Sequence, residues 1–216
     1  QTHKFFGSRA VYAGERGFEI AAKLAGRVNG LAGVTAWTRS TVLGYYPDGV
    51  LTVRRDGGYC EVKPQKLVVA SGAAEKNLAF ANNDLPGIYG AGAVQTLMNV
   101  YGVQPARRVV MVGGGNIGMI VAYQLLQAGV EVAAVVEAAP EPGAYRVHAD
   151  KVKRLGIPIL TSCTVKEAHG ISCLEGVTVQ GLDASFRPVA GTEQYLAADG
   201  LCLAVGLTPL VELLWQ

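Results

Sequence analysis

Three glycines in the middle of the chain could bind phosphate groups. They form the pattern G-x-G-x-x-G at Gly113, Gly115 and Gly118, directly after the apolar run 109–112. In this pattern the first glycine allows a tight turn, the second lets a diphosphate approach the backbone, and the third lets a helix pack closely on a strand. The N–H groups and the positive dipole end of that helix would attract the phosphate charge. The predicted phosphate-binding loop consists of Gly113, Gly114, Gly115, Asn116, Ile117 and Gly118.

An acidic residue follows this loop at a distance that suits a ribose. Glu137 lies about 20 residues beyond the last glycine, where the acidic residue of a dinucleotide-binding unit binds ribose hydroxyls. A carboxylate there would also repel a 2′-phosphate, and no Lys or Arg follows before Arg146. The sequence therefore favours NAD over NADP. The alternative is that the glycines form a flexible turn and that Glu137 is a solvated residue at the end of a strand.

Gly206 is a further candidate for cofactor contact. It ends the last apolar run of the chain, at 200–205. The nicotinamide half of a dinucleotide would extend along the carboxyl edge of the sheet toward such a later strand, and a glycine would let the backbone approach it. An ordinary turn glycine explains the same residue.

No side chain stands out as a catalytic acid, base or nucleophile, and no metal site is expected. This is compatible with hydride chemistry, in which the cofactor reacts and the protein orients it. The histidines and cysteines are scattered and lack partners at metal-site or triad spacing; they are His3, His148, His169, Cys60, Cys163, Cys173 and Cys202.

The elements around the loop predict an α/β fold. Apolar runs and helical periodicity alternate in the order β-α-β-α-β, which indicates a parallel sheet. We expect a Rossmann-like sheet with helices on both faces and a three-stranded meander. The predicted strands are 107–112, 130–136, 157–160 and 200–205, the helices are 116–128 and 144–155, and the meander is 164–196.

The first part of the chain predicts a partial second lobe. A buried strand at 66–70 ends at Ser71-Gly72, and it resembles the run 200–207. This similarity between two segments indicates two related lobes, although two unrelated core strands would give the same pattern. The other predicted elements are helix 14–28, strands 34–37, 41–45, 50–54 and 59–62, loop 82–92 and helix 93–101.

The composition excludes several classes of protein. With 50% hydrophobic and 17% charged residues in 216, the chain is globular rather than disordered. A net charge of +2 is too small for a dedicated nucleic-acid binder. No apolar run approaches the roughly 18 residues that span a membrane. Four scattered cysteines suit a reducing compartment, so we expect a cytoplasmic protein without a membrane or nucleic-acid partner.

With these motifs in place, the chain resembles the pyridine nucleotide–disulfide oxidoreductase superfamily, flavoproteins with two dinucleotide-binding domains. The likeness rests on 68–76 (VVASGAAEK), 109–118 with Glu137, and 198–209 (ADGLCLAVGLTP), together with a link-like run at 83–99. It is particularly similar to the alpha subunits of heterotetrameric sarcosine oxidase, dye-linked proline dehydrogenase, opine oxidase and hydrogen cyanide synthase. The opening residues 3–19 support this narrower group.

The resemblance implies two cofactors and a partner subunit. FAD would lie in the first lobe, with Ser71 and Gly72 nearby and with Val42 approaching the adenine through backbone atoms. NAD would lie in the second lobe, on the glycine loop and Glu137. The chain would then belong to a hetero-oligomeric dehydrogenase. The implied parts are a partial FAD-type lobe at 1–82, a link at 83–104, an NAD-binding lobe at 105–210 and the start of the return to the first lobe at 211–216.

The chain also departs from the family pattern. The first FAD glycine fingerprint, the second flavin-contacting Gly-Asp segment and the redox-active cysteine pair are missing from these 216 residues. We therefore expect a piece of a longer protein that does not hold FAD tightly by itself and does not reduce disulfides, with FAD bound in the intact parent protein. Two functions follow: part of an FAD- and NAD-dependent oxidoreductase acting on an amine or amino acid, or a non-catalytic dinucleotide-binding or subunit-assembly module.

Overall fold

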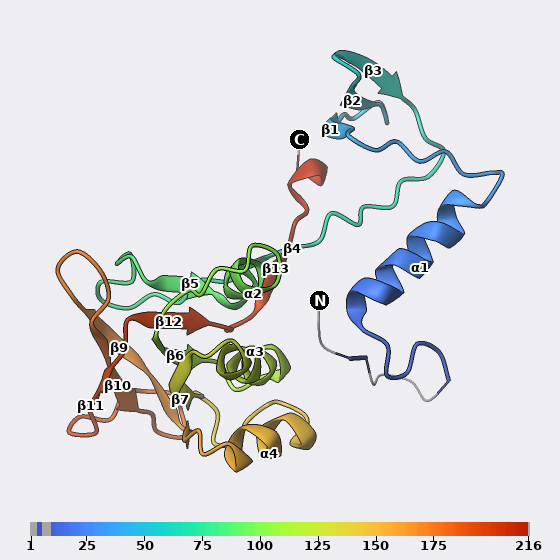
Figure 1. The fold of residues 1–216 in the computed structure, drawn as a ribbon. Helices are drawn as coiled ribbons and strands as arrows, with labels where there is room; N and C mark the ends of the chain where they lie inside the picture. The colour runs from blue at the N-terminus through green and yellow to red at the C-terminus, as the bar shows by residue number, and fades with distance from the viewer. Residues whose placement is uncertain (1–3, 6–9, 216) are drawn as a thin grey trace. The chain divides into compact units, whose positions relative to one another are not determined.

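The computed structural model describes residues 4–5 and 10–215, and it divides into two compact units (Figure 1). One unit runs up to Ala74 and resumes at Thr208, and the other is Glu75–Leu207. Two short strands, β4 (Ala73–Glu75) and β13 (Leu207–Pro209), pair with each other where the chain passes between the units. The expected lobe boundaries at 82, 104 and 210 stay predictions.

A five-stranded parallel sheet forms the centre of the Glu75–Leu207 unit. Its order is β5-β12-β6-β7-β8. Val112, the last residue of β6, pairs with the last residues of both neighbours, Val136 and Leu203. The carboxyl ends of these strands therefore meet along one edge, where α/β proteins bind ligands. The strands are β5 (Ile88–Gly90), β12 (Gly200–Leu203), β6 (Arg108–Val112), β7 (Glu131–Val136) and β8 (Ile159–Leu160).

Three helices cover one face of this sheet (Figure 1). They are α2 (Ala91–Asn99), α3 (Asn116–Gln127) and α4 (Arg146–Arg154). Met119 and Leu125 of α3 are fully buried against Met111 of β6. The helix ends before Gly129, whose φ of +79° favours glycine after a helix.

An antiparallel meander covers the other face. Its strands are β9 (Cys163–His169), β10 (Gly176–Gly181) and β11 (Gln194–Ala197), in the order β11-β10-β9. Val177 and Val179 pack with Val110 and Leu201 of the parallel sheet. The α/β class with a parallel sheet and a meander is therefore confirmed.

One detail of the fold class differs from expectation. Among the described residues of this unit, the helices pack on one face of the sheet rather than on both. Successive residues of β6 point to opposite faces, so that Met111 meets the helices and Val110 meets the meander. The apolar side of the meander thus takes the place that a second helical layer would have.

The other unit contains a helix and a small antiparallel sheet. The helix is α1 (Gly17–Asn29), the sheet has the order β1-β2-β3, and a 3-10 turn, η1 (Glu212–Leu214), lies near the end of the chain. The strands β1 (Thr41–Tyr45), β2 (Leu51–Arg55) and β3 (Gly58–Val62) agree with the predicted ones to within one residue.

Two predicted strands were wrong. Residues 34–37 and 66–70 form no strand, and Val68 is 88% exposed. A β-strand needs a neighbouring strand for its backbone hydrogen bonds, so an apolar run alone does not make one. The predicted loop 82–92, by contrast, contains a strand, because Ile88–Gly90 pairs with β12 as β5. Of the two similar runs, only 200–207 contributes a strand of the parallel sheet.

Candidate functional site

The glycine loop after β6 has a backbone that other residues could not adopt. Gly113 has φ +104°, and a Cβ there would overlap the carbonyl oxygen of Ala204. Its N–H donates to the carbonyl of Val136 at 2.8 Å, which fixes the turn against β7. A Cβ on Gly118 would overlap the carbonyl oxygen of Gly113. Both glycines are therefore needed for α3 to leave the strand so sharply.

Gly115 is different, because the space in front of it is open. No described atom lies within 4 Å of the position that its Cβ would take. It is also the N-cap of α3, with φ −73° and ψ 178°, and no side chain caps this end of the helix in the described part of the chain. The first N–H groups of a helix have no acceptor within the helix. The loop thus presents an accessible backbone and the positive end of a helix dipole, which suit an anionic diphosphate.

Glu137 points at this loop. Its Oε2 accepts the N–H of Gly114 at 2.6 Å, and its Oε1 accepts the N–H of Ala139 at 2.8 Å. Because Gly114 has no side chain, the Glu137 carboxylate can lie close to its backbone. A Cβ on Gly114 would lie 2.8 Å from Oε2. The structure therefore brings together the two features that the sequence placed on neighbouring strands. It adds a direct hydrogen bond that spacing alone could not predict.

The segment before α4 is joined to the same loop. The N–H of Ala144 donates to the carbonyl of Gly114 at 3.0 Å, and the N–H of Tyr145 donates to Oδ1 of Asn116 at 2.8 Å. The Tyr145 side chain is 71% exposed beside this contact. Asn116, predicted as a cofactor contact, thus uses its side-chain oxygen to hold the next element. No pattern in the sequence predicted the contacts of Ala144 or Tyr145.

Gly206 has a structural reason of its own. Its φ is +131°, and its carbonyl accepts the N–H of Lys76 at 2.9 Å. The Lys76 side chain crosses the open side of the glycine, with Cδ 3.4 Å from the position of a Cβ. Gly206 thus anchors the residues that follow β4 to the end of β12.

Burial makes two cysteine thiols of this unit poor nucleophiles. Burial raises the pKa of Cys202, and the nearby charge of Glu75 raises it further. Burial also raises the pKa of Cys163. The pKa of His148 is lowered by burial and then by the charge of Lys151. The thiols of Cys163 and Cys202 therefore stay protonated at neutral pH. Among the described residues no group of three or more His, Cys, Asp or Glu side chains is placed to bind a metal ion.

The three residues that the resemblance assigned to FAD lie in the other unit. The Ser71 hydroxyl donates to the carbonyl of Leu210, whose N–H donates to the carbonyl of Gly72 at 3.0 Å. Gly72 has φ +88°, and Val42 lies in β1, paired with Val53.

These residues do not make a diphosphate site by themselves. The described residues of this unit contain one α-helix, α1, and it does not follow a glycine-rich turn after a strand. Its N-terminus is already occupied, because the carboxylate of Glu19 accepts the N–H of Arg16 at 2.8 Å. An FAD diphosphate therefore has no cradle among the described residues of this unit.

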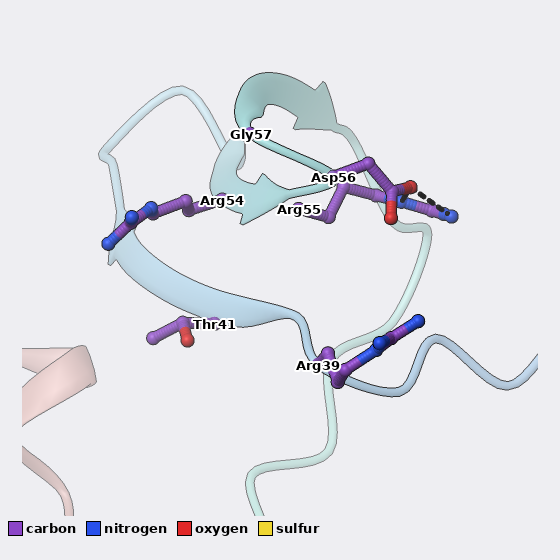
Figure 2. Close-up of a pocket in the computed structure, with 6 residues that line it drawn as sticks. All are labelled: Arg39, Thr41, Arg54, Arg55, Asp56 and Gly57. Atoms are coloured by element: carbon purple, nitrogen blue, oxygen red, sulfur yellow. Dashed lines mark hydrogen bonds and ion pairs between the residues drawn. The ribbon is translucent and has the colours of Figure 1, made fainter.

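A cavity of about 300 Å³ in the same unit lies beside the turn between β2 and β3. Three arginines line it, together with Thr41, Asp56 and Gly57. Figure 2 shows that the side chains of Arg39 and Arg54 point to opposite sides of it. Arg55 is already paired with Asp56 at 2.9 Å and stacks over the Trp37 ring. The three guanidinium groups therefore do not converge on one ligand position.

No described helix is long and apolar enough to cross a bilayer.

The comparisons with known proteins identify relatives of this chain. Sarcosine oxidase subunit alpha of Rhizobium meliloti (strain 1021) is 28% identical over 219 residues, covering 94% of this chain and 21% of that protein. Hydrogen cyanide synthase subunit HcnB of Pseudomonas protegens is 28% identical over 172 residues, covering 72% of this chain and 37% of that protein. The chain thus spans well under half the length of these two curated relatives.

A solved structure supports the fold. Thioredoxin reductase from T. acidophilum superposes with a TM-score of 0.69 at 21% sequence identity, covering 92% of this chain and 62% of that one. The family pattern of the pyridine nucleotide-disulphide oxidoreductases matches residues 7–216, nearly the whole chain. The resemblance inferred from the motifs is confirmed, and this chain belongs to the pyridine nucleotide-disulphide oxidoreductase family.

Proposed function

We propose that the Glu75–Leu207 unit binds NAD(H) on the loop between β6 and α3. The observation that carries this proposal is the hydrogen bond from Gly114 N–H to Glu137 at 2.6 Å, beside the open face of Gly115. It places an acid for the ribose next to a helix N-terminus for the diphosphate. Membership of the family implies use of FAD and a pyridine nucleotide.

Each part of the loop has a distinct role in this proposal. The backbone N–H groups after Gly115 hold the diphosphate, and the Glu137 carboxylate accepts hydrogen bonds from the adenosine ribose. Asn116 is a positioning residue, since its side chain fixes the segment before α4. The bound nicotinamide supplies the hydride chemistry, and the protein orients it.

The preference for NAD over NADP rests on charge. A 2′-phosphate would approach the Glu137 carboxylate, and like charges at such a distance repel. The nearest later basic residue is Arg146, whose side chain is 93% exposed and pairs with Asp150 at 3.4 Å. In the structure its ion-pair partner is therefore a carboxylate of its own helix.

The larger role is part of an FAD- and NAD(H)-dependent oxidoreductase that passes electrons between a flavin and a nicotinamide or an amine or amino-acid substrate. The support is the similarity to subunits of sarcosine oxidase and hydrogen cyanide synthase, which also favours a partner subunit. FAD would bind in the intact parent protein, near Ser71, Gly72 and Val42. Location in the cytoplasm is part of the same proposal.

A non-catalytic dinucleotide-binding or subunit-assembly module is the second candidate. One observation favours it: α1 has no buried residue, and Phe18 and Leu24 are 52% and 44% exposed. Such apolar side chains are available to a partner surface. Binding of NADH without turnover would favour this candidate.

Two titrations test the proposal. NADH and NADPH are titrated separately into the purified chain, with binding followed by calorimetry. We expect NADH to bind and NADPH to bind at least tenfold more weakly. Absence of NADH binding contradicts the proposed function, whereas equal affinities contradict only the NAD preference. Oxidation of NADH by a dye acceptor, with and without added FAD, then separates the enzyme from the module.

A further inference from the structure

The end of α1 carries a pair of residues that can react with each other. Asn29 is the last residue of the helix, and Gly30 follows it. Among the asparagines of the chain, only Asn29 precedes a glycine. The backbone nitrogen that follows an asparagine can attack the carbonyl carbon of its side chain. A glycine leaves this approach open, because it has no Cβ.

The Asn29 side chain is accessible and can turn toward the backbone. Asn29 and Gly30 are both exposed, and in the described part of the chain the Asn29 carboxamide makes no hydrogen bond. The carboxamides of Asn82, Asn83 and Asn116, in contrast, each bond to a backbone group at 2.8–3.0 Å. These three side chains are held away from the attack that Asn29 is free to undergo.

One hydrogen bond of the helix protects the attacking nitrogen. The N–H of Gly30 donates to the carbonyl of Gly26 at 3.1 Å. This bond must open, and the nitrogen must lose its proton, before it can react. The rate of reaction at Asn29 therefore depends on how easily the last turn of α1 opens.

The helix α1 is weakly anchored. None of its residues is buried. Its contacts through side chains include an ion pair from Lys23 to Glu15 at 2.7 Å and a hydrogen bond from Arg27 to Tyr12 at 3.3 Å. Surface contacts of this kind add little stability, and a helix end without packed side chains opens at low cost.

The helix α2 ends in the same way but is packed. Its last residue, Asn99, is exposed, and the N–H of Val100 donates to the carbonyl of Thr96 at 3.0 Å. Ala91 and Val94 of this helix are 0% and 1% exposed in the core. The end of α2 therefore opens less easily, and the branched side chain of Val100 also shields its backbone nitrogen.

We propose that Asn29 is a site of spontaneous deamidation, a covalent modification that requires only water. The backbone nitrogen of Gly30 loses its proton to solvent and bonds to Cγ of Asn29, the Cγ–Nδ2 bond breaks, and ammonia leaves. Water then opens the resulting succinimide ring. Attack of water at Cγ gives aspartate, and attack at the backbone carbonyl carbon gives isoaspartate. Nothing is oxidised or reduced in either step.

The modification changes the end of α1. Both products place a carboxylate at the C-terminus of the helix, where the dipole is negative and disfavours an anion. Isoaspartate also adds a side-chain carbon to the backbone and so displaces Gly30 from its helical position. The last turn should therefore lose protection against hydrogen exchange. This inference is independent of the proposed function, because α1 and the glycine loop lie in different units.

Peptide mapping of the purified chain tests the proposal. The chain is incubated at mildly alkaline pH, folded or in urea, and digested with trypsin. The tryptic peptide 28–39 contains Asn29 as its only carboxamide side chain. We expect its mass to rise in the folded chain by the difference between a hydroxyl and an amino group, with separate aspartate and isoaspartate forms. Conversion in urea without conversion in the folded chain would overturn the proposal.

Gly30→Ala tests the role of the glycine. A Cβ at this position would lie 3.5 Å from the carbonyl oxygen of Gly26 and 3.6 Å from that of Arg27, both ordinary contacts, so the fold should be retained. We expect conversion of Asn29 to slow about tenfold, because the Cβ hinders the approach to Cγ. An unchanged rate would contradict the proposed reaction.

Val100→Gly is the matched control for anchoring. It places a glycine after Asn99, at the end of the packed helix, and the Val100 side chain that it removes is 71% exposed. In this folded variant we expect Asn99 to convert about tenfold more slowly than Asn29 in the same molecules. Equal rates would show that weak anchoring of α1 does not select Asn29, which contradicts the inference.

A titration separates this inference from the proposed function. The chain before and after conversion should bind NADH with the same affinity, since the glycine loop is in the other unit. Failure of the unconverted chain to bind NADH would overturn the proposed function and leave the deamidation site standing. Failure of Asn29 to convert in the folded chain would do the reverse.

Discussion

At the scale of single residues, the site depends on a carboxylate that already has partners. Glu137 accepts two backbone N–H groups, from Gly114 and Ala139. A carboxylate has about four acceptor positions, so two remain for ribose hydroxyls. Glu137 can therefore fix the loop and bind the sugar at the same time. The loop is held in shape before any ligand arrives, which reduces the entropy lost on binding.

The side chain of Asn116 allows positioning and ligand contact to be separated. Asn116→Asp keeps an acceptor for Tyr145 N–H, so the protection of that amide against hydrogen exchange should be retained. The new negative charge would stand at the start of α3 and repel the diphosphate. We expect NADH affinity to fall at least tenfold.

Asn116→Leu should have the opposite effect on hydrogen exchange at the Tyr145 amide. It removes the acceptor, so the Tyr145 amide should exchange faster. Retained NADH affinity in Asn116→Asp would show that the diphosphate binds elsewhere.

At the scale of elements, the sequence predicted best where local pattern and tertiary context agree. The glycine pattern and periodicity located β6, α3 and β7 to within one residue, because turn chemistry and core packing favour the same boundaries there. The run 66–70 failed because no neighbouring strand satisfies its backbone among the described residues. The contact between Asn116 and Tyr145 could not be predicted, because it joins residues whose proximity depends on the packed fold.

The N-terminus of α2 is stabilised by a carboxylate from outside the helix. Glu75 accepts the N–H of Gly92 at 2.6 Å, and a Cβ on Gly90 would overlap the Glu75 carboxylate. Glu75→Ala should lower the free energy of unfolding by about 1–2 kcal/mol. Gly90→Ala should destabilise the chain by displacing that carboxylate.

The two substitutions should not be additive. In the double variant the carboxylate is gone, so Gly90→Ala should cost little more than Glu75→Ala alone. Urea unfolding of the unaltered chain, the two single variants and the double variant measures the coupling between the two residues. Additive losses would mean that Gly90 is required for another reason.

His148 makes the stability of α4 depend on pH. Its pKa lies below the ordinary value of 6.5, because burial and the Lys151 ammonium disfavour the imidazolium. The unfolded chain then binds more protons than the folded one between the two pKa values. The contribution of His148 to the free energy of unfolding should therefore be complete above pH 6.5. It should be lost as the pH drops through the pKa of the folded state.

Replacement of the imidazole tests this expectation. His148→Gln should flatten that part of the stability profile, measured by urea unfolding across the range. NMR titration of the His148 ring reports its pKa directly. A midpoint at or above 6.5 would contradict the account.

At the scale of the whole molecule, the two units differ in how complete their sites are. The Glu75–Leu207 unit has a parallel sheet with apolar layers on both faces and a formed glycine loop, where we propose that the diphosphate binds. The other unit carries the residues assigned to FAD without a diphosphate cradle in its described part. The family pattern spans both units, so the sequence predicted the kind of protein better than the state of each site.

This difference predicts how the purified chain behaves with flavin. We expect this chain, expressed alone, to purify without stoichiometric FAD, as judged by visible absorbance. It should nevertheless bind NADH, because the loop and Glu137 lie in the other unit. A stoichiometric yellow protein would show that the FAD site is complete within these residues.

Gly115→Val tests the central claim most directly. Its Cβ would enter open space at φ −73°, so the fold should tolerate it with a loss of stability within about 1 kcal/mol. The same side chain would occupy the place where the diphosphate meets the backbone. Gly33→Val, at an equally open position in the other unit, is the matched control. We predict that calorimetry detects no NADH binding to Gly115→Val and normal binding to Gly33→Val; unchanged affinity in the folded Gly115 variant would contradict the account.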